Sequence, residues 1–138
     1  MAIIGLDVGD RHIGVAMAVG SVAVPVDVIE RTEEADDIER IAALARDYET
    51  ELIVVGLPRS MDGSVGAQAN LVLDFAKVLA NRIDVPIEMC DERLTTVAAE
   101  RLMRESGTKR RKRKANIDAM AAAVILQSYI DGALKRIE

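Results

Sequence analysis

Acidic residues at three separated places carry the strongest chemical signal in this sequence. Asp7 interrupts an apolar run, Asp91 and Glu92 follow a second run, and Asp118 stands near the start of a long apolar segment. Burying an ionised carboxylate is costly unless it is paired, hydrogen-bonded or bound to a metal. Carboxylate oxygens suit Mg2+ or Mn2+, and a pair of such ions about 4 Å apart activates water and stabilises the leaving oxygen in phosphodiester cleavage. The three places together predict a divalent-metal site for that reaction.

Each acidic residue also has an ordinary structural explanation. Asp7 could accept hydrogen bonds from the turn at Gly9–Asp10, and Asp91–Glu92 could pair with Arg93. A carboxylate at Asp118 would be stabilised by the dipole at the start of a helix. The metal hypothesis therefore depends on the three places being brought together by the fold.

The residues around Asp7 add two expectations. Gly5 and Gly9 flank it at a spacing of two, which predicts open space on the same face of the strand. His12 is the single histidine and has no partner evident from its spacing, so we expect a surface or hydrogen-bonded side chain rather than a ligand or base.

Short apolar runs joined by tight turns predict three antiparallel strands at the start of the chain. Pro25 cannot donate to a strand ladder, which places the third strand at the sheet edge. Helices and strands then alternate, as in parallel strands joined by crossovers. The predicted strands are 3–8, 11–19, 21–30, 52–55 and 85–90. The predicted helices are 35–48, one from the loop 57–66 to about residue 82, one capped by Thr95 or Thr96 and ending near Ser106–Gly107, and 117–134 capped by Asn116.

Helical spacing also predicts which faces are buried. The second helix should bury a stripe made of Leu71, Phe75, Val78 and Leu79. The last helix is apolar almost all round, which is typical of a helix in the core or in a subunit interface.

This order of elements predicts a single α/β domain over residues 1–138, with a five-stranded mixed sheet flanked by helices. Strands one to three are antiparallel, and strands four and five are parallel. This is the order of the ribonuclease H fold, in which the first strand is central. A doubly wound, all-parallel sheet is excluded because the first three strands have no crossovers. Since the C-terminal ends of parallel strands converge, Asp7 and Asp91–Glu92 should meet at one rim.

The charge distribution points to an anionic partner. The formal net charge is -5, yet the segment Lys109–Lys114 (KRRKRK) carries six positive charges just before Asp118. The members of this segment are Lys109, Arg110, Arg111, Lys112, Arg113 and Lys114. A solvated loop of no consequence is the alternative for this run. The loop after the fourth strand supplies Arg59, Ser60 and Ser64 as further candidates for phosphate contact.

Scarce aromatic residues argue against recognition by base stacking, because the chain has two Tyr, one Phe and no Trp. The longest apolar run, 119–126, is too short to span a bilayer, which needs about 20 residues. Cys90 is the only cysteine, so no internal disulfide or cysteine-rich zinc site is expected. These features predict a cytoplasmic protein with no membrane partner.

Four blocks of sequence resemble one family in order and spacing. They are GLDVGDRHIGVA, IVVGLPRSMDGSVG, DERLTT and RKRKANIDAMAAAVILQSYID. They are similar to the YqgF/RuvX family of ribonuclease H-like Holliday junction resolvases, also described as pre-16S rRNA nucleases. The resemblance implies a divalent-metal-dependent nuclease, with Mg2+ or Mn2+ as the ion, that trims the 5' end of precursor 16S rRNA or cuts branched DNA. We also expect the chain to form a homodimer. The family's acidic positions fall on Asp7, Glu92 and Asp118, and Asp91 remains a further candidate ligand.

Two positions depart from the family pattern. Asp10 stands where threonine is usual, and Arg59–Ser60 stands where a residue followed by asparagine is common. Two other functions remain open: a non-catalytic nucleic-acid-binding factor in ribosome assembly, and a nucleotide-binding module like one domain of actin or Hsp70. The second needs two such domains to enclose its nucleotide, and 138 residues supply one.

Overall fold

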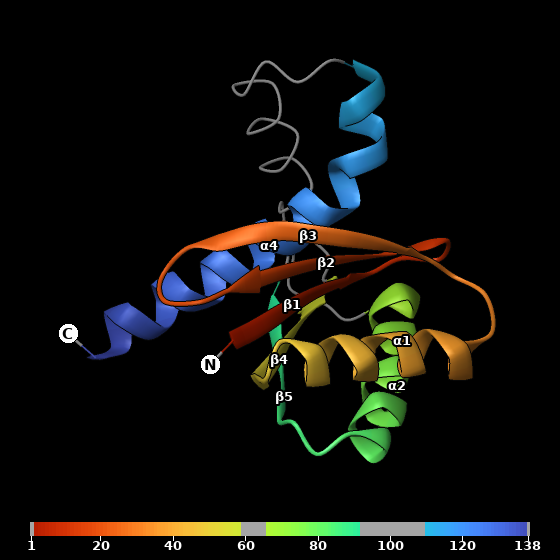
Figure 1. Cartoon of the computed structure of the whole chain (residues 1–138), viewed down its shortest axis with the longest axis horizontal. Coiled ribbons are helices and arrows are strands. Elements are labelled where there is room, and N and C mark those ends of the chain that lie inside the picture. The colour runs from red at the N-terminus through yellow and green to blue at the C-terminus, as the bar shows by residue number, and fades with distance from the viewer. Residues whose placement is uncertain (1, 59–65, 92–109, 138) are drawn as a thin grey trace.

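The computed structural model describes residues 2–58, 66–91 and 110–137, with side chains of the last segment described for residues 117–132. Five strands form one sheet in the order β3-β2-β1-β4-β5 (Figure 1). The strands are β1 (Ala2–Val8), β2 (His12–Ala18), β3 (Ala23–Glu30), β4 (Thr50–Leu57) and β5 (Ile87–Asp91). The helices are α1 (Glu34–Asp47), α2 (Ala67–Arg82) and α4 (Arg110–Ile137).

The predicted sheet topology is confirmed. Strand β1 lies at the centre, antiparallel to β2 and parallel to β4, which in turn is parallel to β5. Strand β3 pairs with β2 alone, so Pro25 lies on an edge strand as expected. In the β1–β2 pair Asp7 stands opposite Gly14, and cross-strand partners project to the same face of a sheet.

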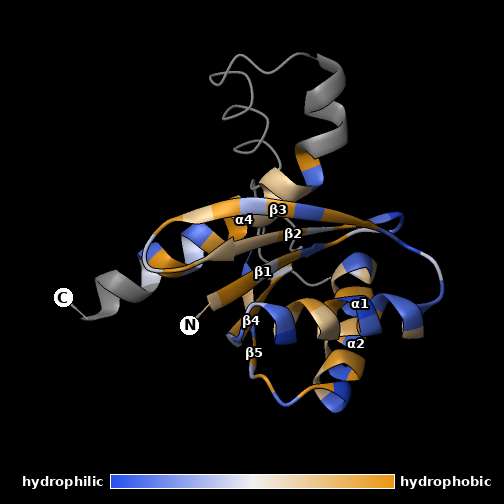
Figure 2. Ribbon diagram, in the orientation of Figure 1, coloured by the Kyte–Doolittle hydropathy of each residue, from blue (hydrophilic) through white to orange (hydrophobic). Residues whose placement is uncertain are grey.

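Helices cover the two faces of the sheet unequally. Helices α1 and α2 lie on one side, and α4 runs across the other (Figure 1). Alternation along β1 divides its residues between these layers: Ile4, Leu6 and Val8 pack in the cluster of α1 and α2, whereas Ile3 packs against the cluster of α4. Figure 2 shows β1 as mainly hydrophobic, while α1 alternates between hydrophilic and hydrophobic residues. Strand β1 is thus the shared wall of both cores.

Glycine residues in β1 and β2 allow the backbone of α4 to pack directly against the backbone of the sheet. A Cβ built on Gly5 would lie 2.8 Å from Leu126 Cβ and 3.1 Å from the Ala122 carbonyl oxygen. A Cβ built on Gly14 would lie 1.8 Å from the Asp118 carbonyl oxygen, which no side chain tolerates. The expectation of open space beside Asp7 is therefore wrong at Gly5, because α4 fills that space.

The last helix begins earlier than its sequence pattern predicted. Its first residue is Arg110, so Asn116 lies inside the helix and is not its cap. Arginine and lysine are good helix formers, and no glycine or proline separates Arg110 from Asp118, so nothing interrupts the helix. Most of the basic run therefore belongs to the same helix as Asp118 rather than to a loop.

The buried face of α2 differs from the predicted stripe at two positions. Phe75 and Leu79 are buried as expected, but Leu71 and Val78 are exposed. Ala69, Val72 and Ala76 face the core instead. These residues follow the helical period with Phe75 and Leu79, so one continuous face of α2 is buried. The helix predicted to follow Thr95 or Thr96 lies outside the described residues, and no described helix is long and apolar enough to cross a bilayer.

The contact at Gly14 makes a stability prediction. Replacing Gly14 with alanine forces α4 away from β2, and overpacking of this kind costs about 1–3 kcal/mol or more of the free energy of unfolding. Gly66→Ala is the matched control because nothing lies within 4 Å of a Cβ built there. Urea denaturation measures both variants, and equal stability of the two would contradict the proposed close contact.

Candidate functional site

Asp7 stands near the C-terminal end of the central strand, on the face covered by α4. It shares this face with Ile3 and Gly5, which contact α4, and its side chain is half-buried. The opposite face of β1 is closed by buried Leu6 and Val8. The carboxylate is thus aimed at the side of the sheet on which Asp118 lies.

Asp118 reaches the same place from α4. Its carbonyl oxygen packs on Gly14, and Gly14 is the cross-strand partner of Asp7. Gly14, which has no side chain, is therefore the residue that lies between Asp7 and Asp118. The side chain of Asp118 is 35% exposed, so it is accessible to solvent and to a ligand. The fold brings together two of the predicted acidic positions, which are 111 residues apart in the sequence.

His12 is a member of this cluster that the sequence analysis missed. Its Nδ1 lies 3.6 Å from Asp118 Oδ2, with 46% of the histidine side chain exposed. The expectation of a surface side chain at His12 is confirmed, and the structure adds Asp118 as its partner, which the spacing did not indicate. One signal was available: His12 and Gly14 are two residues apart on β2 and must share a face.

Asp91 ends β5 on the other side of β4. The residues before it alternate: Glu88 accepts a hydrogen bond from the Tyr129 hydroxyl of α4, and the Cys90 thiol donates to the Ile125 carbonyl oxygen over 3.9 Å. Ile87 and Met89 pack instead in the cluster of α1 and α2. By this alternation Asp91 belongs to the face opposite Asp7, so the structure does not gather it with Asp7 and Asp118.

Several predicted site residues lie outside the described residues: Glu92, Arg59, Ser60, Ser64 and Lys109. Within residues 2–58, 66–91 and 110–137, no three His, Cys, Asp or Glu side chains gather closely enough to hold a metal ion. The described donors at this end of the sheet are oxygen-rich, which suits Mg2+ or Mn2+. By their chemistry, Asp7 and Asp118 fit such an ion as two of its ligands. A third protein ligand would have to come from residues outside the described ranges.

The basic run stands close to Asp118 along the helix axis. Lys114 precedes Asp118 by four residues of α4 and Arg110 by eight, which at 1.5 Å per residue is about 6 Å and about 12 Å along the axis. The backbone of Arg110–Lys114 therefore starts within about two turns of the acidic pair. An anionic polymer held by these cations would pass near Asp7 and Asp118.

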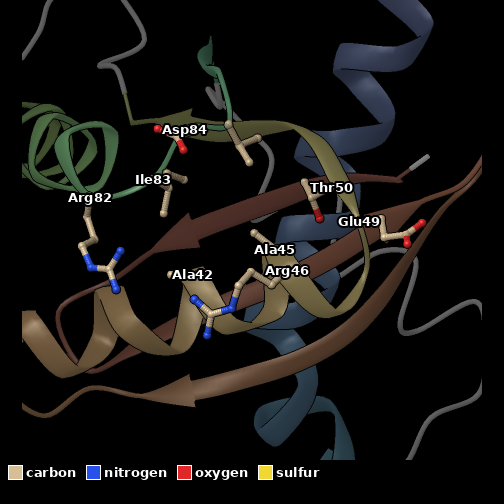
Figure 3. Close-up of a pocket in the computed structure, with 9 residues that line it drawn as sticks. Ala42, Ala45, Arg46, Glu49, Thr50, Arg82, Ile83 and Asp84 are labelled. Carbon is tan, nitrogen blue, oxygen red and sulfur yellow. The ribbon is translucent and has the colours of Figure 1, made fainter.

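The cavity in Figure 3 lies elsewhere. It measures about 310 Å³ and is lined by residues from the ends of α1 and α2 and the start of β4, including Arg46, Thr50 and Arg82. Because β1 and β4 are parallel, the start of β4 lies at the opposite end of the sheet from Asp7. Among the described residues, Thr50 Oγ1 is buried there without a hydrogen-bond partner. Of the acidic residues predicted for catalysis, the three that the structure describes, Asp7, Asp91 and Asp118, do not line this cavity.

The sheet is mixed and its first strand is central. One carboxylate stands at the end of that strand, and another stands on the helix that crosses it. These features define a ribonuclease H-like protein. Solved structures share this fold. RuvC of T. thermophilus in complex with a Holliday junction substrate matches with a TM-score of 0.65 at 16% identity, over 98% of this chain and 96% of that one. The fowlpox virus Holliday junction resolvase matches with a TM-score of 0.58 at 11% identity, over 96% and 99%.

The family follows from closer relatives. The model of the RuvX family, described as Holliday junction resolvase, matches residues 1–132. A protein of Desulforamulus reducens named "Putative pre-16S rRNA nuclease" is 47% identical over 98% of this chain and 100% of its own length. A protein of Clostridium novyi with the same name is 45% identical over 95% of this chain and 98% of its own. The chain belongs to the RuvX family.

The acidic pair predicts a metal-dependent gain in stability. At a Mn2+ concentration ten times the dissociation constant, binding adds about 1.4 kcal/mol to the free energy of unfolding and raises the melting temperature by about 5 °C. Asp118→Asn should remove this shift, because it replaces an anionic ligand with a neutral amide. Asp36→Asn, which makes the same change at an exposed position of α1, should retain it. Equal metal-induced shifts in both variants would exclude Asp118 as a ligand.

Proposed function

We propose that this protein is a divalent-metal-dependent nuclease that hydrolyses phosphodiester bonds in structured nucleic acid. The observation that carries the proposal is the placement of Asp118 against Gly14, directly across from Asp7. Two carboxylates from distant parts of the chain are held on one face beside an exposed rim. Asp7 is half-buried, Asp118 is 35% exposed, and carboxylate oxygens of this kind suit Mg2+ or Mn2+.

The proposed ligands are Asp7, Asp118 and Glu92. Alternation along β5 disfavours Asp91 as a ligand, because it places Asp91 on the face opposite Asp7. Glu92 is proposed as the third ligand on the family resemblance. When bound, Mg2+ or Mn2+ supplies an activated water and charge stabilisation at the leaving oxygen. The chain supplies the rigid frame: Asp7 is fixed by the central strand, and Asp118 is fixed by a helix that cannot come closer to the sheet.

The substrate is held by its phosphates in this proposal. Lys109–Lys114, with Arg59, Ser60 and Ser64, would bind the backbone of the nucleic acid. The place of most of this run on α4 supports the assignment, because one continuous helix backbone carries both Arg110–Lys114 and Asp118. Phosphate contacts carry no base information, so these residues set affinity and register rather than sequence preference.

We propose precursor 16S rRNA as the principal substrate, acted on at its 5' end in the cytoplasm. The names of relatives at 45–47% identity, with nearly equal length, support this choice. The likeness to resolvases at 16% identity or less concerns the fold, so branched DNA is the second candidate. The actin or Hsp70 alternative is disfavoured because the full-length relatives match this one domain from end to end.

A direct cleavage assay tests the nuclease proposal. The purified chain with Mn2+ is expected to cut a precursor 16S rRNA fragment faster than a four-way DNA junction. Asp7→Asn should slow cleavage at least about a hundredfold, which is about 2.7 kcal/mol of activation free energy. Asp36→Asn is the control of equal charge. A non-catalytic assembly factor would instead bind the RNA and leave it uncut, and Asp7→Asn would then bind equally well.

The basic run makes a separate prediction about binding. Replacing Arg110, Arg111 and Lys112 with glutamine keeps good helix formers and removes three cations from α4. The slope of log affinity against log salt should become shallower by about 2–3, since each phosphate contact contributes about 0.7–0.9. The matched control replaces three cations of α1 and α2, Arg46, Lys77 and Arg82, with glutamine. If the control flattens the slope as much, the phosphates are not held by α4.

The homodimer remains a prediction. The apolar composition of α4 is explained by burial of Ala122, Ile125 and Leu126 against the sheet, so it no longer argues for a subunit interface. We propose the dimer from the sequence alone. Light scattering at micromolar concentration tests it, and a mass near 15.0 kDa would contradict it.

A further inference from the structure

The turn between β1 and β2 connects Asp7 to the strand that carries His12 and Gly14. The hairpin closes through a hydrogen bond from the Gly9 amide to the His12 carbonyl oxygen, 2.9 Å long. Asp10 and Arg11 form the tip. Any change in this turn shifts Asp7 relative to the strand on which α4 rests.

Arg31 holds this turn at both of its ends. Its Nη1 donates to the Gly9 carbonyl oxygen at 3.0 Å, and its backbone amide donates to the Arg11 carbonyl oxygen at 2.9 Å. Arg31 directly follows the last residue of β3, 22 residues after Gly9. Arg31, which follows the edge strand β3, thus fixes the backbone of the turn that follows the central strand β1.

The guanidinium of Arg31 is itself fixed from two sides. Its Nε donates to Asp37 Oδ2 at 3.2 Å, and its central carbon lies 5.2 Å from the centre of the Phe75 ring. Asp37 is fully buried, and its other oxygen accepts the Thr32 amide at 3.1 Å. The arginine side chain is 23% exposed. The contacts with Asp37 and Phe75 therefore hold the planar guanidinium of Arg31 in the orientation in which it donates to Gly9.

These partners lie on the side of the sheet opposite the acidic pair. Phe75 belongs to the cluster of α1 and α2, and Asp37 lies in the first turn of α1, whereas Asp118 belongs to α4 on the other face. A cavity of about 160 Å³ lies beside this network, and Gly9, Asp10 and Arg31 are among the residues that line it. Within the described part of the chain, the route from Arg31 to Asp7 is therefore the backbone of the turn.

We infer that Arg31 is a positioning residue for the proposed metal site, acting through the Gly9 carbonyl to set where Asp7 stands relative to Asp118. This inference rests on the proposed function. A lysine at position 31 has one compact cation in place of a fork, so it cannot hold both Asp37 and Gly9 in the same geometry. The inference requires the fork, whereas a purely stabilising role requires only that the buried charge of Asp37 be compensated.

Two variants separate positioning from stability. Arg31→Lys keeps the charge but loses the fork. The double variant Arg31→Met with Asp37→Asn removes both charges, so no buried carboxylate is left unpaired, but the Gly9 carbonyl loses its donor. Arg82→Gln is the matched control, because it removes another guanidinium that makes two hydrogen bonds to a carboxylate, Glu39, between α1 and α2.

The readouts are Mn2+ affinity by titration, kcat and KM on the RNA substrate, and the urea midpoint. We expect Arg31→Lys and the double variant to bind Mn2+ about tenfold more weakly and to lower kcat by about tenfold, with KM for RNA within twofold of the wild type. We expect the double variant to regain much of the stability that Arg31→Met alone loses, but none of the metal affinity. Arg82→Gln should match the wild type in kcat and in Mn2+ affinity.

The inference is overturned if the double variant recovers Mn2+ affinity together with stability, or if Arg31→Lys binds Mn2+ like the wild type. Amide hydrogen exchange at Gly9 adds a readout that needs no activity: it should accelerate in both Arg31 variants and not in Arg82→Gln. A wild type that neither binds Mn2+ nor cleaves nucleic acid would overturn the proposed function instead. In that case accelerated exchange at Gly9 would show a structural role for Arg31 alone, and the positioning role would fall too.

Discussion

The structure depends on the direct contact between helix α4 and the glycines of the two central antiparallel strands. At Gly14 the helix backbone occupies the place of a side chain, and at Gly5 it comes almost as close. Glycine in a strand costs about 0.5–1 kcal/mol in conformational freedom. Here that cost is offset by close packing of an alanine-rich helix surface, in which Ala122 is fully buried. The depth at which α4 lies on the sheet is therefore set by backbone atoms and not by adaptable side chains.

This contact explains how a chain of ordinary size can hold two acidic side chains in a fixed relation. Asp7 gains its place from the hydrogen-bonded centre of the sheet, and Asp118 gains its place from the helix that rests on Gly14. Neither depends on a loop. The network of Arg31 and Asp37 then fixes the turn that follows Asp7 from the opposite face of the sheet. Strand β1 thus carries Asp7 and also forms part of both hydrophobic cores.

The sequence allowed the element order, the central position of β1 and the edge position of β3 to be predicted, because turn residues and apolar periodicity are local signals. It did not reveal the role of Gly5 or Gly14, since a close approach involves a helix more than 100 residues away. Asp118 as a partner for His12 was missed for the same reason. The start of α4 was misplaced because a run of like charges was taken as a loop, although its residues favour helix. The burial of Asp37 carries no such local signal, because it depends on its bonds to Arg31 and to the Thr32 amide.

The most direct measurement of the central claim is the position of a bound metal ion. Crystals of the chain grown with Mn2+ and measured near the manganese absorption edge would place the ion by its anomalous scattering. The account predicts a peak between Asp7 and Asp118, at distances of about 2.0–2.4 Å from their carboxylate oxygens. Asp118→Asn crystals should lack that peak. A manganese ion bound elsewhere, with Asp7 and Asp118 both free of it, would contradict the account.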